Sequence, residues 1–174
     1  MTREPAIRLA NPDDAAAFAA VVARGFAETR HFPMPSSALD EDEADIRVAL
    51  ERGAGLLASL EGQVVGCARF RFDPTESSGS SRPRLFFSRL CVVPEARRRG
   101  VARSMLSALE AEARAAGADG LAMTVRSQQP DNRPFWLRLG FVITGYSERY
   151  GIEDMVTHME RPILEGRPKA GVET

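Results

Sequence analysis

Residues 85–104 read LFFSRLCVVPEARRRGVARS, and along them the hydrophobic pattern changes from that of a strand to that of a helix. The part before Pro94 is rich in aromatic and β-branched residues, and it ends at a proline, which cannot donate to a strand ladder. After Gly100, apolar residues recur at three- and four-residue spacing, at Ala102, Met105, Leu106, Leu109, Ala113 and Ala116. Gly117 follows the last turn, where helices commonly end in a glycine. This stretch therefore predicts a strand, a turn and a helix in succession.

The predicted turn contains three arginines, Arg97–Arg99, followed by Gly100. The first turn of a helix leaves about four N–H groups without an intrahelical partner and carries roughly half a positive charge, which together suit a pyrophosphate. A glycine lets the backbone approach such an anion because it has no Cβ. A solvated basic loop is the alternative that charge alone favours.

The rest of the chain predicts strands and helices on either side of this stretch. Strands are expected at residues 6–9, 56–60, 63–72, 120–126, 141–150 and 155–161. Helices are expected from Asn11, a capping residue followed by a proline at the first helical position, and at residues 41–52 and 134–140. Residues 29–40 and 73–84 are expected to be loops. Because residues 85–126 form a strand, a helix and a strand, they imply a parallel pair of strands.

Length and composition are those of one globular domain. The chain has 174 residues, 44% of them hydrophobic, which suits one substantial core and is too short for two ordinary domains. A net charge of −1 argues against nucleic acid as the main partner, although the arginines keep that alternative open. No leader opens the chain and no apolar run approaches the roughly 20 residues that cross a bilayer, so we expect a cytoplasmic protein with no membrane partner.

Cysteine usage and short motifs narrow the chemistry further. Cys67 and Cys91 both lie in predicted strands, which favours buried free thiols of a reducing compartment over a disulfide. The sequence contains no CxxC, HExxH, GxxxxGK or GxGxxG motif. Metal, Walker-type nucleotide and dinucleotide sites are therefore not expected.

Two motifs resemble those of the GNAT superfamily of N-acetyltransferases. Residues 97–102, Arg-x-x-Gly-x-Ala, follow Leu-x-Val-x-Pro at 90–94 and are similar to the family's acyl-CoA signature, Arg or Gln, x, x, Gly, x, Gly or Ala. Residues 135–141, Phe-Trp-x-x-x-Gly-Phe, resemble the aromatic pair and Gly-Phe of the family's late helix. The resemblance favours the anion site over the solvated basic loop.

The order of predicted elements is also similar to the whole GNAT fold, over residues 5–163. The resemblance implies an α/β (mixed α+β) fold, in which a central mixed sheet has splayed parallel strands and helices on both faces. We expect a single GNAT N-acetyltransferase domain at residues 1–164 and a flexible C-terminal tail at 165–174. A doubly wound α/β domain with a phosphate site is the alternative.

The resemblance implies acetyl-CoA, or another acyl-CoA, as co-substrate, with no metal. In the family, the turn and helix start bind the pyrophosphate, and the preceding strand pairs with the pantetheine arm through main-chain groups that also stabilise an oxyanion. Asn132 would lie on the pantetheine or near the adenosine phosphate, and Trp136 would contact the cofactor. The implied cofactor-binding residues are Leu90, Cys91, Val92, Val93, Arg98, Arg99, Gly100, Val101, Ala102, Arg103, Ser104, Asn132 and Trp136.

Neither motif identifies the catalytic residues. Transfer to an amine needs a base, because a lysine-like amine has a pKa near 10.4 and is mostly protonated at pH 7. Some relatives carry a carboxylate in the central strand, where this chain has Ser88 and Arg89. Ser88, His31 and Glu148 are the candidates, and an ordinary surface role is the alternative for each. Trp136 replaces the tyrosine that many relatives use as an acid, and an indole N–H keeps its proton at neutral pH.

These features leave more than one function open. The first is an N-acetyltransferase that moves an acetyl (acyl) group to a primary amine of a small molecule or protein by direct attack in a ternary complex. The second is an acyl-CoA-binding regulatory module with little or no transferase activity, and a nucleic-acid patch at residues 97–103 is a third alternative. Residues 29–40 and 146–154 are expected to contact the acceptor, but their mixed charges do not identify it. The oligomeric state is also open, a homodimer included.

Overall fold

The computed structural model describes residues 4–32, 34–73, 83–126, 131–148 and 155–163. Its centre is a seven-stranded sheet in the order β1-β2-β3-β4-β5-β7-β6. The strands are β1 (Ala6–Ala10), β2 (Ala54–Leu60), β3 (Gln63–Asp73), β4 (Arg84–Val92), β5 (Gly120–Arg126), β6 (Val142–Glu148) and β7 (Met155–Pro162). The helices are α1 (Ala15–Gly25), α2 (Glu43–Arg52), α3 (Val101–Ala115) and α4 (Arg133–Arg138). This mixed architecture confirms the predicted fold class.

The first helix begins where its capping signal predicts. Asn11 Oδ1 accepts from the Asp13 N–H, and the Asp14 carboxylate accepts from the Asn11 N–H, both at 2.9 Å. This reciprocal cap starts a 3₁₀ turn, from which α1 continues directly. The helix then buries one apolar face, at Ala15, Phe18, Val21 and Val22.

The second helix begins two residues later than residue 41, where the sequence predicted its start. Asp42 is the N-cap, because its Oδ1 accepts from the Asp45 N–H at 2.9 Å while the Asp45 carboxylate accepts from the Asp42 N–H at 3.2 Å. Glu41 therefore lies outside the helix, and its side chain turns toward the sheet.

The connection between α1 and α2 is more regular than the predicted loop at residues 29–40. It contains 3₁₀ turns at Ala27–His31 and Ser37–Asp40. Ser36 caps the second turn by accepting from the Ala38 N–H at 3.3 Å, and its own N–H donates to Thr29 Oγ1 at 3.1 Å. These short-range bonds give the connection a defined shape.

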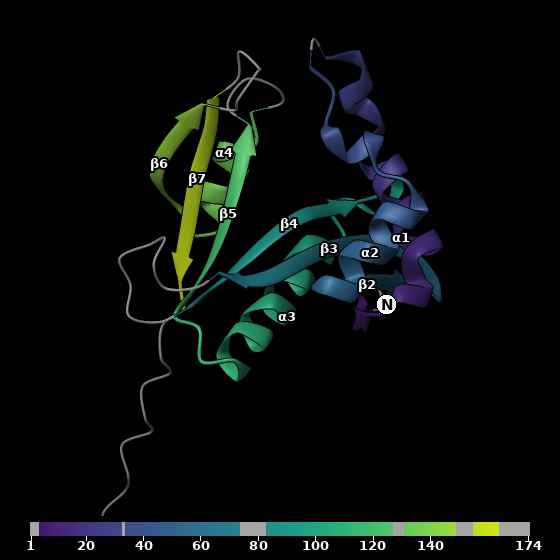
Figure 1. Cartoon of the computed structure of the whole chain (residues 1–174), viewed down its shortest axis with the longest axis horizontal. Coiled ribbons are helices and arrows are strands. Elements are labelled where there is room, and N and C mark those ends of the chain that lie inside the picture. The colour runs from purple at the N-terminus through teal and green to yellow at the C-terminus, as the bar shows by residue number, and fades with distance from the viewer. Residues whose placement is uncertain (1–3, 33, 74–82, 127–130, 149–154, 164–174) are drawn as a thin grey trace, which may run out of the picture.

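β4 and β5 are parallel neighbours that pair over a short length. The register joins Leu85 to Leu121 and Phe86 to Ala122. Beyond Phe86, β4 continues to Val92 and β5 continues to Arg126, and Figure 1 shows the two strands diverging from a common point. The other neighbouring strands of the sheet are antiparallel. The splayed parallel pair, connected through α3, confirms the prediction.

Helices cover both faces of the sheet, as predicted (Figure 1). The Cys91 thiol of β4 lies 3.8 Å from the carbonyl oxygen of Val21 in α1. A Cβ added to Gly66 of β3 would instead lie 3.2 Å from Val101 of α3. Gly66 pairs with Val92, the residue after Cys91, and successive strand residues point to opposite faces. We therefore call the two sides the α1 face and the α3 face.

An aromatic cluster joins α4 to the sheet beside the splayed strands. The ring centroid of Trp136 lies 5.6 Å from that of Phe87 in β4 and 5.4 Å from that of Phe141. Trp136 is 7% exposed, so the sole tryptophan of the chain belongs to the core. Edge and tilted ring contacts of this kind add to the free energy gained from burial.

Some predictions concern residues that the structure does not describe. The tail at 165–174, residues 149–154 of the expected acceptor segment and residues 74–82 of the predicted 73–84 loop lie outside the described ranges. Among the helices within those ranges, none is both long and apolar enough to cross a membrane.

Candidate functional site

A β-bulge in β4 lies just beyond the point where this strand parts from β5. The register between β3 and β4 shifts between Cys67 and Arg69, so that two residues of β4, Arg89 and Leu90, face one residue of β3. Arg89 has a φ of 55°, in the left-handed region that few non-glycine residues adopt. A bulge interrupts the ladder and redirects the side chains around it. The bulge therefore lies in the part of β4 that borders the gap between β4 and β5.

The turn between β4 and α3 has the open backbone that the sequence predicts. Gly100 is the N-cap of α3 with a φ of 81°, and an added Cβ would meet no heavy atom within 4 Å, its chain neighbours aside. The Ser104 N–H donates to Gly100 O at 3.0 Å, so the N–H groups of residues 101–103 precede the helical ladder. The turn can therefore present donors and arginine charge to an anion.

Arg97, the first residue of the signature, holds the turn in place through hydrogen bonds of its side chain. Its guanidinium binds the Glu28 carboxylate at 2.9 and 3.0 Å. It also donates to the carbonyl oxygens of Gly25 and Val92, each at 3.2 Å. Arg97 therefore fastens the turn to the end of α1 and to the end of β4.

The strand predicted to contact the cofactor, Leu90–Val93, has mostly buried side chains, which leaves the main chain as its binding element. The thiols of Cys91 and Cys67 lie 3.6 Å apart without a disulfide, which confirms the predicted buried free thiols. Burial, and then the contact with Cys91, raises the pKa of the Cys67 thiol. This thiol is therefore protonated at neutral pH.

The three predicted base candidates lie on separate elements. Ser88 is half-buried in β4, opposite Arg69 in the register, and His31 is exposed at the end of a 3₁₀ turn. Glu148 is the exposed last residue of β6. Strand alternation turns Glu148 away from the face that carries Ser147. The structure thus gives no shared site to these three side chains.

The two predicted residues near the late helix have different surroundings. Asn132 is exposed at the start of α4, and its carbonyl oxygen accepts from the Phe135 N–H at 3.1 Å. Trp136 is buried in the aromatic cluster described above. Contact of either residue with a cofactor stays a prediction, and for Trp136 a packing role is also present.

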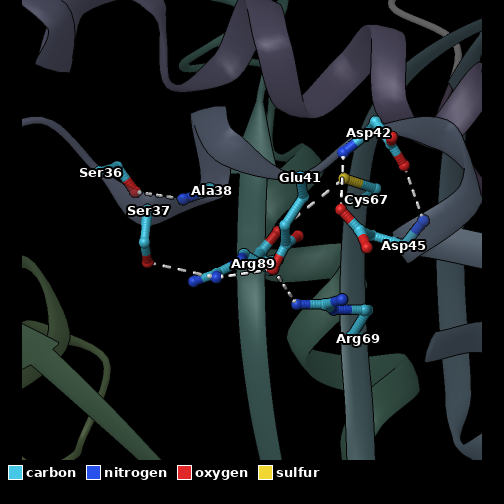
Figure 2. Close-up of polar contacts among 9 residues, drawn as sticks. All are labelled: Ser36, Ser37, Ala38, Glu41, Asp42, Asp45, Cys67, Arg69 and Arg89. Atoms are coloured by element: carbon cyan, nitrogen blue, oxygen red, sulfur yellow. Dashed lines mark hydrogen bonds and ion pairs between the residues drawn. The ribbon is translucent and has the colours of Figure 1, made fainter.

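Glu41, Arg69 and Arg89 form a charged cluster that sequence patterns did not indicate (Figure 2). Nη2 atoms of Arg89 and Arg69 donate to Glu41 Oε1 at 2.7 and 2.9 Å. Burial acts to raise the pKa of Glu41, but the hydrogen bonds and charges of the two arginines outweigh it and lower the pKa below its usual value. Glu41 is therefore ionised at neutral pH and fixes the side chain of the bulge residue.

The second oxygen of the same carboxylate has a different environment. Glu41 Oε2 is buried and has no hydrogen-bond partner within the part of the chain that the structure describes. Ser37 Oγ lies 3.4 Å from Arg89 Nη2, so the connection between α1 and α2 also contacts the cluster. The bulge is thus linked to the segment expected to contact the acceptor.

Comparison with known proteins decides the family. The model of the acetyltransferase (GNAT) family matches residues 23–141, more than half of the chain. The chain belongs to the GNAT family of acetyltransferases. This GNAT protein is 32% identical over 108 residues to a protein named IAA acetyltransferase from Azospirillum brasilense, which covers 62% of this chain and 67% of that protein.

Solved GNAT structures share the fold at lower identity. YncA, a putative acetyltransferase from Salmonella typhimurium solved with its cofactor acetyl-CoA, superposes with a TM-score of 0.69 at 22% identity, covering 95% of this chain and 98% of that chain. The PaiA N-acetyltransferase from Thermoplasma acidophilum, in complex with coenzyme A, gives a TM-score of 0.72 at 14% identity, covering 92% of this chain and 100% of that chain. The predicted GNAT fold is therefore confirmed.

Proposed function

We propose that this GNAT protein transfers an acetyl group from acetyl-CoA to a primary amine of a small molecule or protein, by direct attack in a ternary complex. The observation that carries the proposal is the gap between β4 and β5, which opens beyond Phe86 and has the Gly100 turn beyond the end of β4. The two structural neighbours solved with acetyl-CoA and with coenzyme A support the same ligand here.

Main-chain contacts account for the binding of coenzyme A in this gap. An extended pantetheine arm carries amide groups, which pair with β4 as a further strand would, where β5 has diverged. We assign Leu90–Val93 to this arm. The Ser104 N–H, one of the donors expected from the sequence, already donates to Gly100 O. The pyrophosphate is therefore assigned to the N–H groups of residues 98–103, where the helix dipole and the arginines favour negative charge. Asn132 and Trp136 are assigned to the α4 side of the cofactor.

The bulge supplies the electrostatic part of the reaction. Attack on the thioester places negative charge on the carbonyl oxygen, and preorganised N–H donors stabilise that charge without reorganising during the reaction. The cluster of Glu41 with Arg69 and Arg89 holds the bulged part of β4. We assign the main-chain N–H groups of this bulged part of β4 as the donors to the oxyanion.

Binding and turnover test this proposal in sequence. Acetyl-CoA is titrated while the fluorescence of Trp136, the sole tryptophan, is followed. Thiol release is then measured against a panel of primary amines. We expect a saturable fluorescence change and turnover with at least one amine. A protein that does not bind acetyl-CoA contradicts the proposal.

An acyl-CoA-binding regulatory module is the second candidate, and Trp136 is the observation that favours it. This residue stands where many relatives carry a tyrosine acid, and it packs against Phe87 and Phe141. An indole N–H does not protonate a departing thiolate. However, a thiolate whose pKa is about 8.5 leaves without such an acid. Tight binding with no turnover on any amine supports the module, whereas turnover excludes it.

A further inference from the structure

His158 lies in the middle of β7 on the α1 face of the sheet. Two later residues of the strand, Met159 and Arg161, establish this orientation. Met159 is fully buried, and Arg161 forms an ion pair with Glu110 of α3. These two side chains belong to the α3 face. Because successive strand residues point to opposite faces, His158 belongs to the other face.

The connection between α1 and α2 borders the same region. Arg126, the last residue of β5, donates to the carbonyl oxygens of Met34 at 3.0 Å and Pro35 at 2.8 Å. Arg126 lies two residues beyond Thr124, the direct partner of His158 in the antiparallel register. The segment expected to contact the acceptor is therefore tied to the part of the sheet that carries His158.

The register also places His158 level with the opening between β4 and β5. Phe86 and Ala122 are the last parallel pair. Ser88 and Thr124 each lie two residues further along their strands, on opposite sides of the gap. His158 pairs with Thr124. Neighbouring strands lie about 4.7–4.9 Å apart, so His158 is one strand removed from the edge of the gap. The bulge lies directly after Ser88, so the proposed oxyanion donors and His158 both lie beyond the last parallel pair.

Ser147 of β6 holds the imidazole ring. Its Oγ lies 2.8 Å from His158 Nε2. When Nε2 carries the proton and donates to this oxygen, Nδ1 holds the lone pair that can accept a proton. A hydroxyl in this position fixes the ring orientation, and because it can accept as well as donate, it is compatible with the tautomer that leaves Nδ1 free.

We propose that His158 is the proton acceptor for the amine and that Ser147 is its positioning residue; this inference rests on the proposed transferase function. The neutral amine attacks the thioester carbon, a C–N bond forms, and the carbonyl electron pair moves to oxygen. An N–H proton of the tetrahedral intermediate passes to His158 Nδ1, directly or through one water. The C–S bond then breaks with its electron pair on sulfur, the thiolate takes a proton from solvent, and the imidazolium returns one to solvent.

The charged groups on the α1 face near His158 have partners of their own. Glu160, two residues along β7 on the same face, pairs with Arg84 of β4 at 2.8 Å. Arg126 of β5 binds the α1–α2 connection, and across the gap Glu41 is held by two arginines. The two arginines lower the pKa of Glu41, which makes this carboxylate a weak proton acceptor. An imidazole is the side chain best suited to exchange a proton near neutral pH.

The test measures kcat/KM against pH for His158→Gln, with the best amine from the panel. Glutamine retains a side-chain amide for Ser147 but takes up no proton. We expect kcat/KM to fall by about 10²- to 10³-fold and the acidic limb of its pH profile to disappear. Acetyl-CoA affinity, read from Trp136 fluorescence, should stay within twofold of the wild-type value.

One serine variant and one threonine variant separate the positioning of His158 from general damage to the β6–β7 pair. Ser147→Ala should lower kcat and shift the acidic limb. Thr144→Ala removes another β6 hydroxyl, which donates to the His158 carbonyl oxygen at 3.4 Å and does not contact the ring. We expect the Thr144→Ala profile to match that of the wild type.

Several results would overturn the assignment. One is an acidic limb and a rate within threefold of wild type in His158→Gln, and another is loss of that limb in His31→Gln alone. If His158→Gln does not fold, the wild type is treated with diethyl pyrocarbonate and the modified peptides are mapped. Loss of transfer should then follow modification of His158, and modification of His158 with full activity refutes the role. A wild-type protein with no turnover on any amine contradicts the proposed function itself, which is a different outcome.

Discussion

Replacing Gly100 with alanine separates the backbone strain of the turn from its proposed contact with the pyrophosphate. Gly100 has a φ of 81°, and an added Cβ would meet nothing within 4 Å. The cost to the fold is therefore the left-handed conformation alone, about 1–2 kcal/mol for a residue with a Cβ. For a domain of this size, that cost lowers Tm by about 2–8 °C.

Gly117, at the other end of α3, provides a matched control. Its φ is 72°, and an added Cβ there also meets nothing within 4 Å. Gly117→Ala should therefore lower Tm by a similar amount. Acetyl-CoA affinity should distinguish the two variants. Only the methyl group that Gly100→Ala adds would stand between the backbone N–H groups and the anion.

The assay compares both variants by calorimetric titration of acetyl-CoA and by thermal unfolding without ligand. We expect Gly100→Ala to bind about tenfold more weakly or worse, a loss of ~1.4 kcal/mol, while Gly117→Ala binds like the wild type. Gly100→Glu, which adds a negative charge, should abolish the Trp136 fluorescence change. Equal affinities in the two alanine variants would refute the placement of the pyrophosphate on this turn.

Three further predictions concern the fold around the site. Hydrogen bonds from Arg8 lower the pKa of Asp14 to about 2, so this carboxylate stabilises the fold above an unfolded pKa near 3.9 and ceases to do so as the pH falls toward 2. Thermal melts of Asp14→Asn should therefore depend less on pH between about 4 and 2 than those of the wild type, and an unchanged slope would contradict this. Arg89→Ala should unfold at lower denaturant concentration than Arg89→Gly, because only glycine adopts the bulge conformation without strain, and the reverse order would argue against the bulge. Since Cys67 and Cys91 are buried and the pKa of Cys67 is raised, a thiol reagent should label both only after unfolding, and rapid labelling of the folded protein would be inconsistent with this packing.

The sequence predicted the elements of this fold well, because their signals act over a few residues. The change of period around Pro94, the glycines at both ends of α3 and the Asn11 cap each report a local hydrogen-bond or steric requirement, and the structure has all of them. Motif resemblance added the family and the splayed strands. The start of α2 was misplaced by two residues, since Asp42 and Asp45 form the cap and exclude Glu41 from the helix.

The residues around the reaction could not be read from the chain in this way. The bulge at Arg89 exists only in the register between β4 and β3, and nothing in the local pattern of β4 marks it. Glu41 meets Arg89 across 48 positions of sequence, and Ser147 meets His158 across a strand pair that itself contains a register shift. Local periodicity and caps determined which segments are helices and strands, whereas pairing between distant strands decided which polar side chains share the gap, because register is a property of two segments and not of one.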